Sequence, residues 1–340
     1  MSHEPATEEP DRPEITISGA RPPHGRHARG DVRPEVATSD PPPDRTALPE
    51  EGESSSPMEP VPMEPVAPPQ RRSRAGRNLS AAIGVGLGLG ALILLSLYLV
   101  KGVFLGVVAL AVLLGLWELS NALGSGQVRV PLVPVGVGAV AILVAAYAGG
   151  PEAMTAALAL TLLATMVWRL PEHPSGYIRD TTAGVFVTMY VPFLAGFAAL
   201  LLRSDDGADR VVTFIVLVVL SDVGGYAAGV LFGRHPMAPT VSPKKSWEGF
   251  AGSGLFSAVG GAIMLPVLLD GPAAAGALIG LAVMLTATLG DLGESMIKRD
   301  LGIKDMGSLL PGHGGIMDRL DSLLPAAPVT YLLLAWIVGP

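Results

Sequence analysis

The sequence predicts an all-α integral membrane protein with about nine transmembrane helices, preceded by a disordered N-terminal tail. Apolar stretches long enough to span about 30 Å of hydrocarbon recur along residues 71–340. Hydrophobic residues make up 49% of the chain and charged residues 16%, as expected for a polypeptide that lies mostly in lipid. Residues 1–70 differ sharply, since they hold 16 of the 31 prolines. The chain therefore divides into a tail, 1–70, and a multi-pass membrane domain, 71–340.

The tail, residues 1–70, carries 14 acidic and 6 basic side chains and contains no long apolar run. Such a segment buries too little apolar surface to offset its ordering entropy, so we expect it to be disordered. It does not begin with a basic stretch followed by an apolar one, which argues against a secretory signal. Cysteine is absent from the whole chain. Disulfides and thiolate metal sites are thereby excluded.

Nine apolar stretches in residues 71–340 are predicted to cross the membrane. Little more than Lys101 separates the first two, which predicts a tight helical hairpin. In the first stretch, the glycine pairs Gly84/Gly88 and Gly86/Gly90 allow another helix to approach closely. The predicted spans are 80–100, 102–122, 129–149, 152–170, 180–202, 210–232, 250–270, 272–295 and 322–339.

The charges of the loops predict the orientation of these spans. With a cytoplasmic N-terminus, fourteen of the basic residues after position 70 lie on the inner side and only Lys101, Arg203 and Arg210 on the outer side. That asymmetry follows the positive-inside rule. Two long polar loops, 233–249 and 296–321, then face the cytoplasm, where nucleotides are found.

Two groups of acidic residues flank the second of these loops. Asp291, Glu294, Ser295 and Lys298 have the spacing i, i+3, i+4, i+7, which places them on one face of a helix. Carboxylates near the end of a membrane helix are costly unless they face a cation, a metal or a polar cavity. A structural ion pair with Lys298 or Arg299 is the alternative.

A second acidic pair, Asp318 and Asp321, is spaced i, i+3 at the start of the last span, where helix capping is an alternative role.

Cationic and glycine-rich segments lie between and before these acids. Lys298, Arg299 and Lys304 precede the turn Pro311-Gly312-His313-Gly314-Gly315, whose backbone N–H groups are suited to bind an anion. His313 either binds phosphate or shuttles a proton, or it is an ordinary surface histidine.

The loop 233–249 carries adjacent lysines, Lys244 and Lys245, which bind phosphate as point charges or simply mark the cytoplasmic side. Asp222 lies within an apolar span and is a candidate site residue for that reason. Glu118 is a weaker candidate of the same kind. Because oxygen ligands dominate these segments, Mg²⁺ is favoured over Zn²⁺. Together these features predict phosphoryl or nucleotidyl transfer, and the absence of a P-loop sequence argues against an ordinary ATPase.

The segment 290–322 resembles the signature of phosphatidate cytidylyltransferases (CDP-diacylglycerol synthases). The matching positions are Ser295-Met-Ile-Lys298-Arg299, Lys304-Asp305 and His313-Gly314-Gly315-Ile-Met-Asp318-Arg319-Leu-Asp321. The family's Ser-Pro-Lys-Lys-Thr-Trp-Glu-Gly segment also occurs, from Ser242, with Ser246 in place of threonine. One position departs: the usual Asp-Thr-Gly-Ala-Tyr reads Asp222-Val223-Gly224-Gly225-Tyr226.

The resemblance implies transfer of CMP from CTP to phosphatidic acid, with Mg²⁺ as cofactor and a second cation left open. It further implies a cell-membrane protein whose active site faces the cytoplasm, with no nucleic-acid partner, and it suggests a homodimer. Metal binding is assigned to Asp291, Asp318 and Asp321. Catalytic roles are assigned to Asp291, Asp318, Lys298, Arg299 and His313. Substrate binding is assigned to Asp222, Ser242, Lys244, Lys245, Ser295, Lys304, Asp305, Gly314, Gly315 and Arg319.

Three other functions compete with this interpretation. A related CTP-dependent membrane lipid kinase, such as a polyprenol kinase, would yield a phospholipid in place of a CDP-lipid. An ion-coupled transporter would also place acids within the membrane, although transporters often contain inverted repeats and none is evident here. A CDP-alcohol phosphotransferase is set aside because its Asp-Gly-x-x-Ala-Arg motif is absent.

Overall fold

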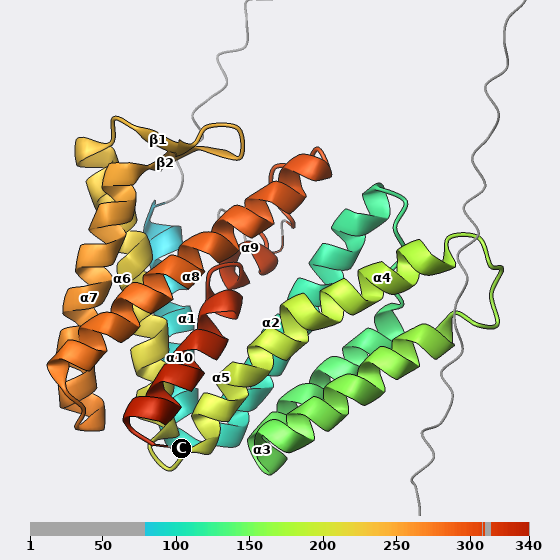
Figure 1. Ribbon diagram of the computed structural model, residues 1–340, viewed down its shortest axis with the longest axis horizontal. Helices are drawn as coiled ribbons and strands as arrows, with labels where there is room; N and C mark the ends of the chain where they lie inside the picture. The colour runs from blue at the N-terminus through green and yellow to red at the C-terminus, as the bar shows by residue number, and fades with distance from the viewer. Residues whose placement is uncertain (1–78, 308, 310–313, 340) are drawn as a thin grey trace, which may run out of the picture. The chain divides into compact units, whose positions relative to one another are not determined.

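A computed structural model describes residues 79–307, 309 and 314–339 and shows a bundle of long helices (Figure 1). The predicted disordered tail, 1–70, and the predicted site residue His313 lie outside the described residues. The helices and strands, in chain order, are α1 (Leu79–Leu99), α2 (Lys101–Ser125), α3 (Leu132–Trp168), α4 (Tyr177–Thr188), the π-helix η1 (Met189–Phe193), α5 (Leu194–Arg203), α6 (Gly207–Phe232), β1 (Pro236–Ala238), β2 (Ser242–Ser246), α7 (Trp247–Leu269), α8 (Ala273–Asp300), α9 (Met317–Leu320) and α10 (Leu323–Ile337).

Seven helical segments among the described residues are long and apolar enough to cross a membrane. This confirms a predominantly helical, multi-pass membrane architecture. The predicted count of nine stays a prediction, because two of the predicted spans fall within α3 and the first falls on α1.

The helix α3 is a hairpin rather than one straight helix. Gly150 has φ 78° and ψ −164°, a conformation that glycine adopts without a steric penalty, and it breaks the helix near its middle. The two halves then run antiparallel, because a Cβ on Gly138 would lie 2.1 Å from Cγ2 of Thr161. The halves correspond to the predicted spans 129–149 and 152–170.

The segment from α4 through η1 to α5 forms one continuous span, Tyr177–Arg203. Its π-helical turn contains Pro192, which lacks the N–H that a regular helix needs at that position. At the start of α4, the buried Asp180 accepts a hydrogen bond from the backbone of Arg129 and pairs with the side chains of Arg169 and Arg179. These contacts fix the loop between α3 and α4 and give Asp180 a structural role.

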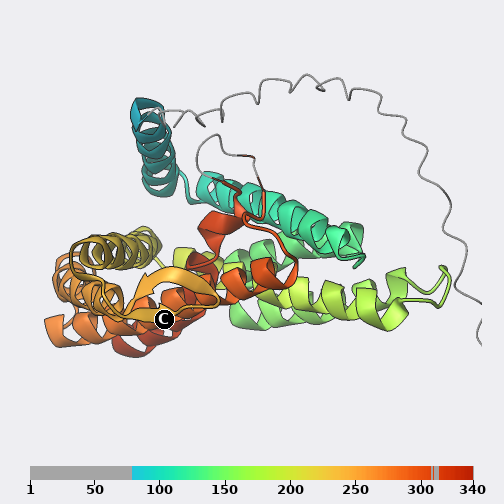
Figure 2. The same ribbon diagram turned by 90° about the horizontal axis from the view of Figure 1, so that it is seen from above.

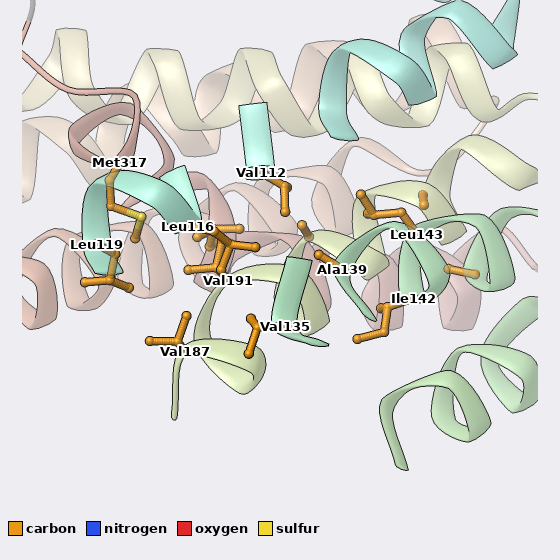
Figure 3. Close-up of a cluster of buried hydrophobic side chains, with 14 of the residues drawn as sticks. Val112, Leu116, Leu119, Val135, Ala139, Ile142, Leu143, Val187, Val191 and Met317 are labelled. Atoms are coloured by element: carbon orange, nitrogen blue, oxygen red, sulfur yellow. The ribbon is translucent and has the colours of Figure 1, made fainter. Parts of the chain in front are cut away.

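Two clusters of buried apolar side chains hold the bundle together. The first joins α2, α3, η1 and α5 to the start of α9, and Figure 3 shows Leu116 and Leu119 of α2 near Met317. The second joins the start of α2 to α5, α6, α8 and α10. The segment α9–α10 contributes to both clusters, so the position of Asp318 and Asp321 depends on both.

A short antiparallel hairpin, β1–β2, was not expected within an all-α fold. Pro236 pairs with Ser246 and Ala238 with Ser242, with an irregular register between them. Figures 1 and 2 show the hairpin at the ends of α6 and α7. It carries the two lysines of the predicted phosphate-binding loop.

Candidate active site

A polar cavity of about 360 Å³ lies where α6, α7, α8 and α9 meet the hairpin. Four carboxylates and three cationic side chains line it, which is unusual in a bundle this apolar. The charged lining residues are Asp222, Asp291, Asp318, Asp321, Lys244, Lys245 and Arg319.

Close contact between small residues brings the three helices of the cavity together. A Cβ on Gly224 of α6 would lie 2.7 Å from the carbonyl oxygen of Gly252 on α7. A Cβ on Gly276 of α8 would lie only 2.0 Å from the carbonyl oxygen of Gly261, also on α7. Such contacts let helix backbones approach closely in a membrane. They align α6 and α8 on either side of α7, so that Asp222 and Asp291 reach the same cavity.

The pair Lys245–Asp291 links the hairpin to α8. Nζ of Lys245 lies 2.6 Å from Oδ2 of Asp291, and both side chains are partly exposed. A second link joins Nε of Arg299, at the end of α8, to the carbonyl oxygen of Val241 at 3.2 Å. The predicted Ser295 contributes little here, since its hydroxyl is 3.5 Å from Asp291.

The base of the hairpin is closed by Glu248, in the first turn of α7. Its carboxylate accepts hydrogen bonds from the backbone of Arg234 and His235 and lies 2.5 Å from Nδ1 of His235. The hydroxyl of Ser246 accepts a hydrogen bond from N of Gly249 at 3.1 Å and so caps α7. Serine supplies the same capping oxygen as the threonine that the family resemblance predicts at this position.

Lys298 bridges two acids from different segments. Its Nζ lies 2.5 Å from Oε2 of Glu294, one turn earlier on α8, and 2.9 Å from Oδ1 of Asp318 on α9. Asp318 also accepts hydrogen bonds from N of Met306 and, at 2.9 Å, from N of Gly315. Asp318 therefore fixes the two chain segments that flank the glycine-rich turn.

The remaining acids, Asp321 and Asp222, lie on different elements of the cavity wall. Oδ1 of Asp321 accepts a hydrogen bond from N of Ser322 at 2.7 Å, and the residue is buried. Within the described part of the chain, no three histidine or acidic side chains lie close enough to hold a metal ion by themselves.

Several predicted site residues lie outside the cavity. Lys304 and Asp305 are exposed and make no ion pair with the described residues. Ser242 lies in β2 opposite Ala238. Gly314 adopts φ +80°, and a Cβ there would approach Oδ2 of Asp318 to 3.3 Å.

Hydroxyl groups of the cavity wall were not singled out by sequence reasoning. Three of them lie close in sequence to an acid: Ser221 precedes Asp222, Tyr226 follows it by one turn, and Thr288 precedes Asp291 by three positions. Helical spacing from the acids identifies these hydroxyls. Glu118 and Glu294 were both noticed in the sequence, but neither was assigned to the site.

Comparison with known proteins identifies similar sequences over most of the chain. The model of the cytidylyltransferase family matches residues 80–337. A phosphatidate cytidylyltransferase of Mycobacterium bovis is 42% identical over 281 residues, which cover 78% of this chain and 92% of that protein. The enzyme of the same name from Mycobacterium leprae is 42% identical over 278 residues, covering 77% and 89%.

A more distant relative, the phosphatidate cytidylyltransferase of Brucella suis, is 40% identical over 154 residues, covering 44% of this chain and 57% of that protein. The similarity to the mycobacterial proteins therefore extends over nearly the whole membrane domain, and the sequence resemblance is confirmed.

Proposed function

The chain belongs to the cytidylyltransferase family, and from that premise we propose how its polar cavity serves the reaction. The activity is that of a phosphatidate cytidylyltransferase, which converts CTP and phosphatidate into CDP-diacylglycerol and pyrophosphate. The observation that carries the proposal is one cavity lined by four carboxylates and three cationic side chains at the ends of membrane helices. A triphosphate and a lipid phosphate both need such an environment.

In the proposed reaction, an oxygen of the lipid phosphate attacks the α-phosphorus of CTP. The new P–O bond forms as the bond between the α-phosphorus and the bridging oxygen breaks, and the electron pair leaves with pyrophosphate. A phosphate monoester is largely anionic near neutral pH, so the nucleophile needs alignment more than a general base. Catalysis then depends on positioning and on neutralising the phosphates.

Cations of the cavity are proposed to bind the phosphates. Lys244, Lys245 and Arg319 line the cavity, and Arg299 joins the end of α8 to the hairpin that carries the lysines. Lys298 contacts Asp318 from outside the lining. Since Lys245 is already paired with Asp291, we propose that it exchanges this carboxylate for a phosphate oxygen when CTP binds.

Mg²⁺ is proposed as the cofactor, and Asp291, Asp318 and Asp321 are the carboxylates from which it would take its protein ligands. The cavity suits a hard cation, because its acidic side chains offer carboxylate oxygens as ligands. Mg²⁺ commonly takes one or two carboxylates and completes its shell with water and substrate phosphates, so a cluster of three acids is not required. When bound, the ion would neutralise charge on the phosphates. Asp291 pairs with Lys245, and Asp318 pairs with Lys298.

We further propose that the cavity faces the cytoplasm from the cell membrane. Lys101, Arg203 and Arg210, the cations predicted to be external, bond to the carbonyl oxygens of Ser204, Ala148 and Gly339, near the start of α6. The hairpin with Lys244 and Lys245 follows the other end of α6. The two groups of charges are thus separated by the length of one membrane helix, which supports the orientation.

A homodimer that forms through α1 is also proposed, on the basis of the glycines of that helix. A Cβ on Gly88 or Gly90 would meet no atom of the described residues within 4 Å, so this small-residue surface of α1 is open to another helix within that part of the chain. Light scattering of the detergent-solubilised protein tests this proposal. A monomeric mass at all concentrations contradicts it.

The assignment of the acids is tested with purified Asp291→Asn and Asp318→Asn proteins and labelled CTP. Each variant should lose at least about 100-fold in kcat/KM, in the range seen when one charge-stabilising group is removed from an active site. Asp270→Asn is the matched control, because Asp270 lies in the loop after α7, away from the cavity lining. Near-normal turnover in either cavity variant removes that residue from the metal site.

Product analysis separates the proposal from its rivals. The purified protein is incubated with phosphatidic acid and CTP, dCTP or ATP, with and without Mg²⁺. A Mg²⁺-dependent CDP-lipid product is expected. A phosphorylated lipid in its place identifies a lipid kinase, and transport in liposomes without nucleotide turnover identifies a transporter.

A further inference from the structure

Glu118 is a buried carboxylate on α2 that the proposed reaction does not use. It is 1% exposed and lies in a helix that is otherwise strongly apolar. An acid at such a position is costly unless it is paired or hydrogen-bonded. Oε2 of Glu118 accepts a hydrogen bond from N of Met317, the first residue of α9, at 2.8 Å. Oε1 has no hydrogen-bond partner among the residues that the structure describes.

Two glycines, one before the glycine-rich turn and one at its end, lie against this carboxylate. A Cβ on Gly307 would lie 2.1 Å from Oε1 of Glu118, and a Cβ on Gly315 would lie 2.5 Å from Oε2. Only a residue without a side chain leaves room for Glu118 at both positions. Glu118 therefore contacts the chain shortly before the turn and again at the last residue of the turn.

Packing along α2 directs Glu118 toward α9. Gly115, one turn earlier on α2, lies against α9, since a Cβ there would approach Cδ1 of Leu320 to 3.1 Å. Leu116 and Leu119 on either side are fully buried in the cluster that includes Met317 (Figure 3). The side chain of Glu118 is thus fixed by rigid neighbours.

Met317 immediately precedes Asp318 and Arg319, which both line the cavity. Glu118 itself does not line it. The hydrogen bond from Met317 to Glu118 therefore holds the first turn of α9 from the side away from the substrate. A carboxyl group suits this role, because its oxygens accept hydrogen bonds from backbone N–H groups.

We propose that Glu118 is a positioning residue for the cytidylyltransferase reaction: it sets where α9 begins and, through α9, where Asp318 and Arg319 face the cavity. This inference rests on the proposed function, since it assigns Glu118 to the same site. A displacement of the reacting groups by about 1 Å can cost about 100-fold in rate. One missing hydrogen bond at the start of α9 therefore has a measurable effect on catalysis.

The test compares Glu118→Ala, Glu118→Asp and Glu118→Gln in the full-length protein. Alanine removes the acceptor, and aspartate keeps the charge but is one methylene too short to reach N of Met317. Both should raise the KM for CTP by about 10- to 100-fold, with a smaller change in the KM for phosphatidate. Glutamine retains an acceptor oxygen and should stay within about fivefold of the wild type.

Ser120→Ala is the matched control, because Ser120 lies one half-turn further along α2 and its buried hydroxyl makes no hydrogen bond to the described residues. It should leave both KM values unchanged.

A second measurement is independent of turnover. Hydrogen exchange of the unliganded protein should show faster exchange of the amides of Met317 and Gly315 in Glu118→Ala and Glu118→Asp than in the wild type or in Ser120→Ala. If the alanine variant fails to fold, the comparison of the aspartate variant with the wild type tests the proposal. Wild-type KM for CTP together with wild-type exchange overturns the proposal. If the wild type makes no CDP-lipid, the proposed function fails, while the exchange experiment still tests the contact.

Discussion

At the scale of single residues, two lysines pair with the carboxylates at the cavity. Lys245 contacts Asp291 at 2.6 Å, and Lys298 contacts Asp318 at 2.9 Å. Partial burial makes these pairs stronger than the same pairs in water. A triphosphate competes for the lysines while a cation competes for the carboxylates, so the two ligands should favour each other's binding.

Lys245→Met tests this exchange of partners. Loss of the ammonium group removes one neutralising charge from the phosphates and leaves Asp291 without its present partner. We expect kcat/KM for CTP to fall by about 100-fold or more, in the range of a single electrostatic contact in an active site. Steady-state kinetics at saturating Mg²⁺ measures the loss.

Lys245→Arg is the companion variant, since it keeps the positive charge while changing its geometry. We expect it to recover part of the activity. If both variants turn over as fast as the wild type, Lys245 has no role in binding the phosphates.

At the scale of helices and strands, the sequence predicted contacts along a helix better than contacts between segments. The spacing of Glu294 and Lys298 predicts their ion pair, because i and i+4 are neighbours on a helix. Asp291 lies on the same stretch, yet it pairs with Lys245 from the hairpin. No local rule connects those two residues, since their contact follows from how α6, α7 and α8 pack.

The hairpin itself could not be predicted for a related reason. Its second strand reads Ser-Pro-Lys-Lys-Ser, without the β-branched or aromatic residues that favour strands. Contacts from elsewhere hold it: Glu248 closes its base, and Arg299 binds the carbonyl of Val241 near its tip. From the sequence, Glu118 was likewise only a weak candidate, because its partner Met317 is distant in the chain.

Gly276→Ala tests whether the packing of α7 and α8 positions the cavity. The added Cβ would lie 2.0 Å from the backbone oxygen of Gly261, which no rotamer can relieve. Overpacking of this kind costs about 1–3 kcal/mol, so the melting temperature in detergent should fall. Activity of the folded fraction should also fall, because α8 carries Asp291.

The control for this substitution is Gly293→Ala, on the same helix, where a Cβ meets no atom within 4 Å. Alanine stabilises a helix by about 1 kcal/mol relative to glycine. The Gly293→Ala variant should therefore melt at the same temperature as the wild type or higher. Equal melting temperatures and equal activities of the two variants would contradict the proposal that packing between α7 and α8 positions the cavity.

Arg169→Met tests a contact that serves stability alone. Nη2 of Arg169 lies 3.1 Å from Oδ2 of Asp180, with only 7% and 2% of the side chains exposed. Removing Arg169 leaves the buried Asp180 with only the half-exposed Arg179 and the backbone N–H of Arg129 as partners. Because breaking a buried pair costs about 3–5 kcal/mol, we expect a loss of stability toward the lower end of that range. Thermal unfolding should shift down, while kcat/KM of the folded protein should stay unchanged, because neither residue lines the cavity.

Arg179 provides the matched control for Arg169, since it contacts the same Asp180 but is half exposed. Arg179→Met should cost less than about 1 kcal/mol. A loss of activity in Arg169→Met at unchanged stability would assign that residue a function that the structure does not suggest.

At the scale of the whole molecule, α6 runs between two groups of cationic side chains. Near its start, Arg210 and Lys101 bond to the chain at Gly339 and Ser204. Beyond its other end lie the hairpin, with Lys244 and Lys245, and the cavity. The positive-inside rule predicts that the cavity end faces the cytoplasm. Sidedness is therefore a property that the intact membrane can test directly.

Because the chain contains no cysteine, single cysteines report sidedness without background. Ser175→Cys, in the exposed loop between α3 and α4, should be shielded from a membrane-impermeant maleimide in intact cells and labelled after permeabilisation. Asp205→Cys, exposed near the start of α6, should be labelled in intact cells. Both variants should retain CDP-lipid synthesis, since neither residue lines the cavity. The reverse labelling pattern would place the cavity outside, away from cytoplasmic CTP, and would contradict the proposed orientation.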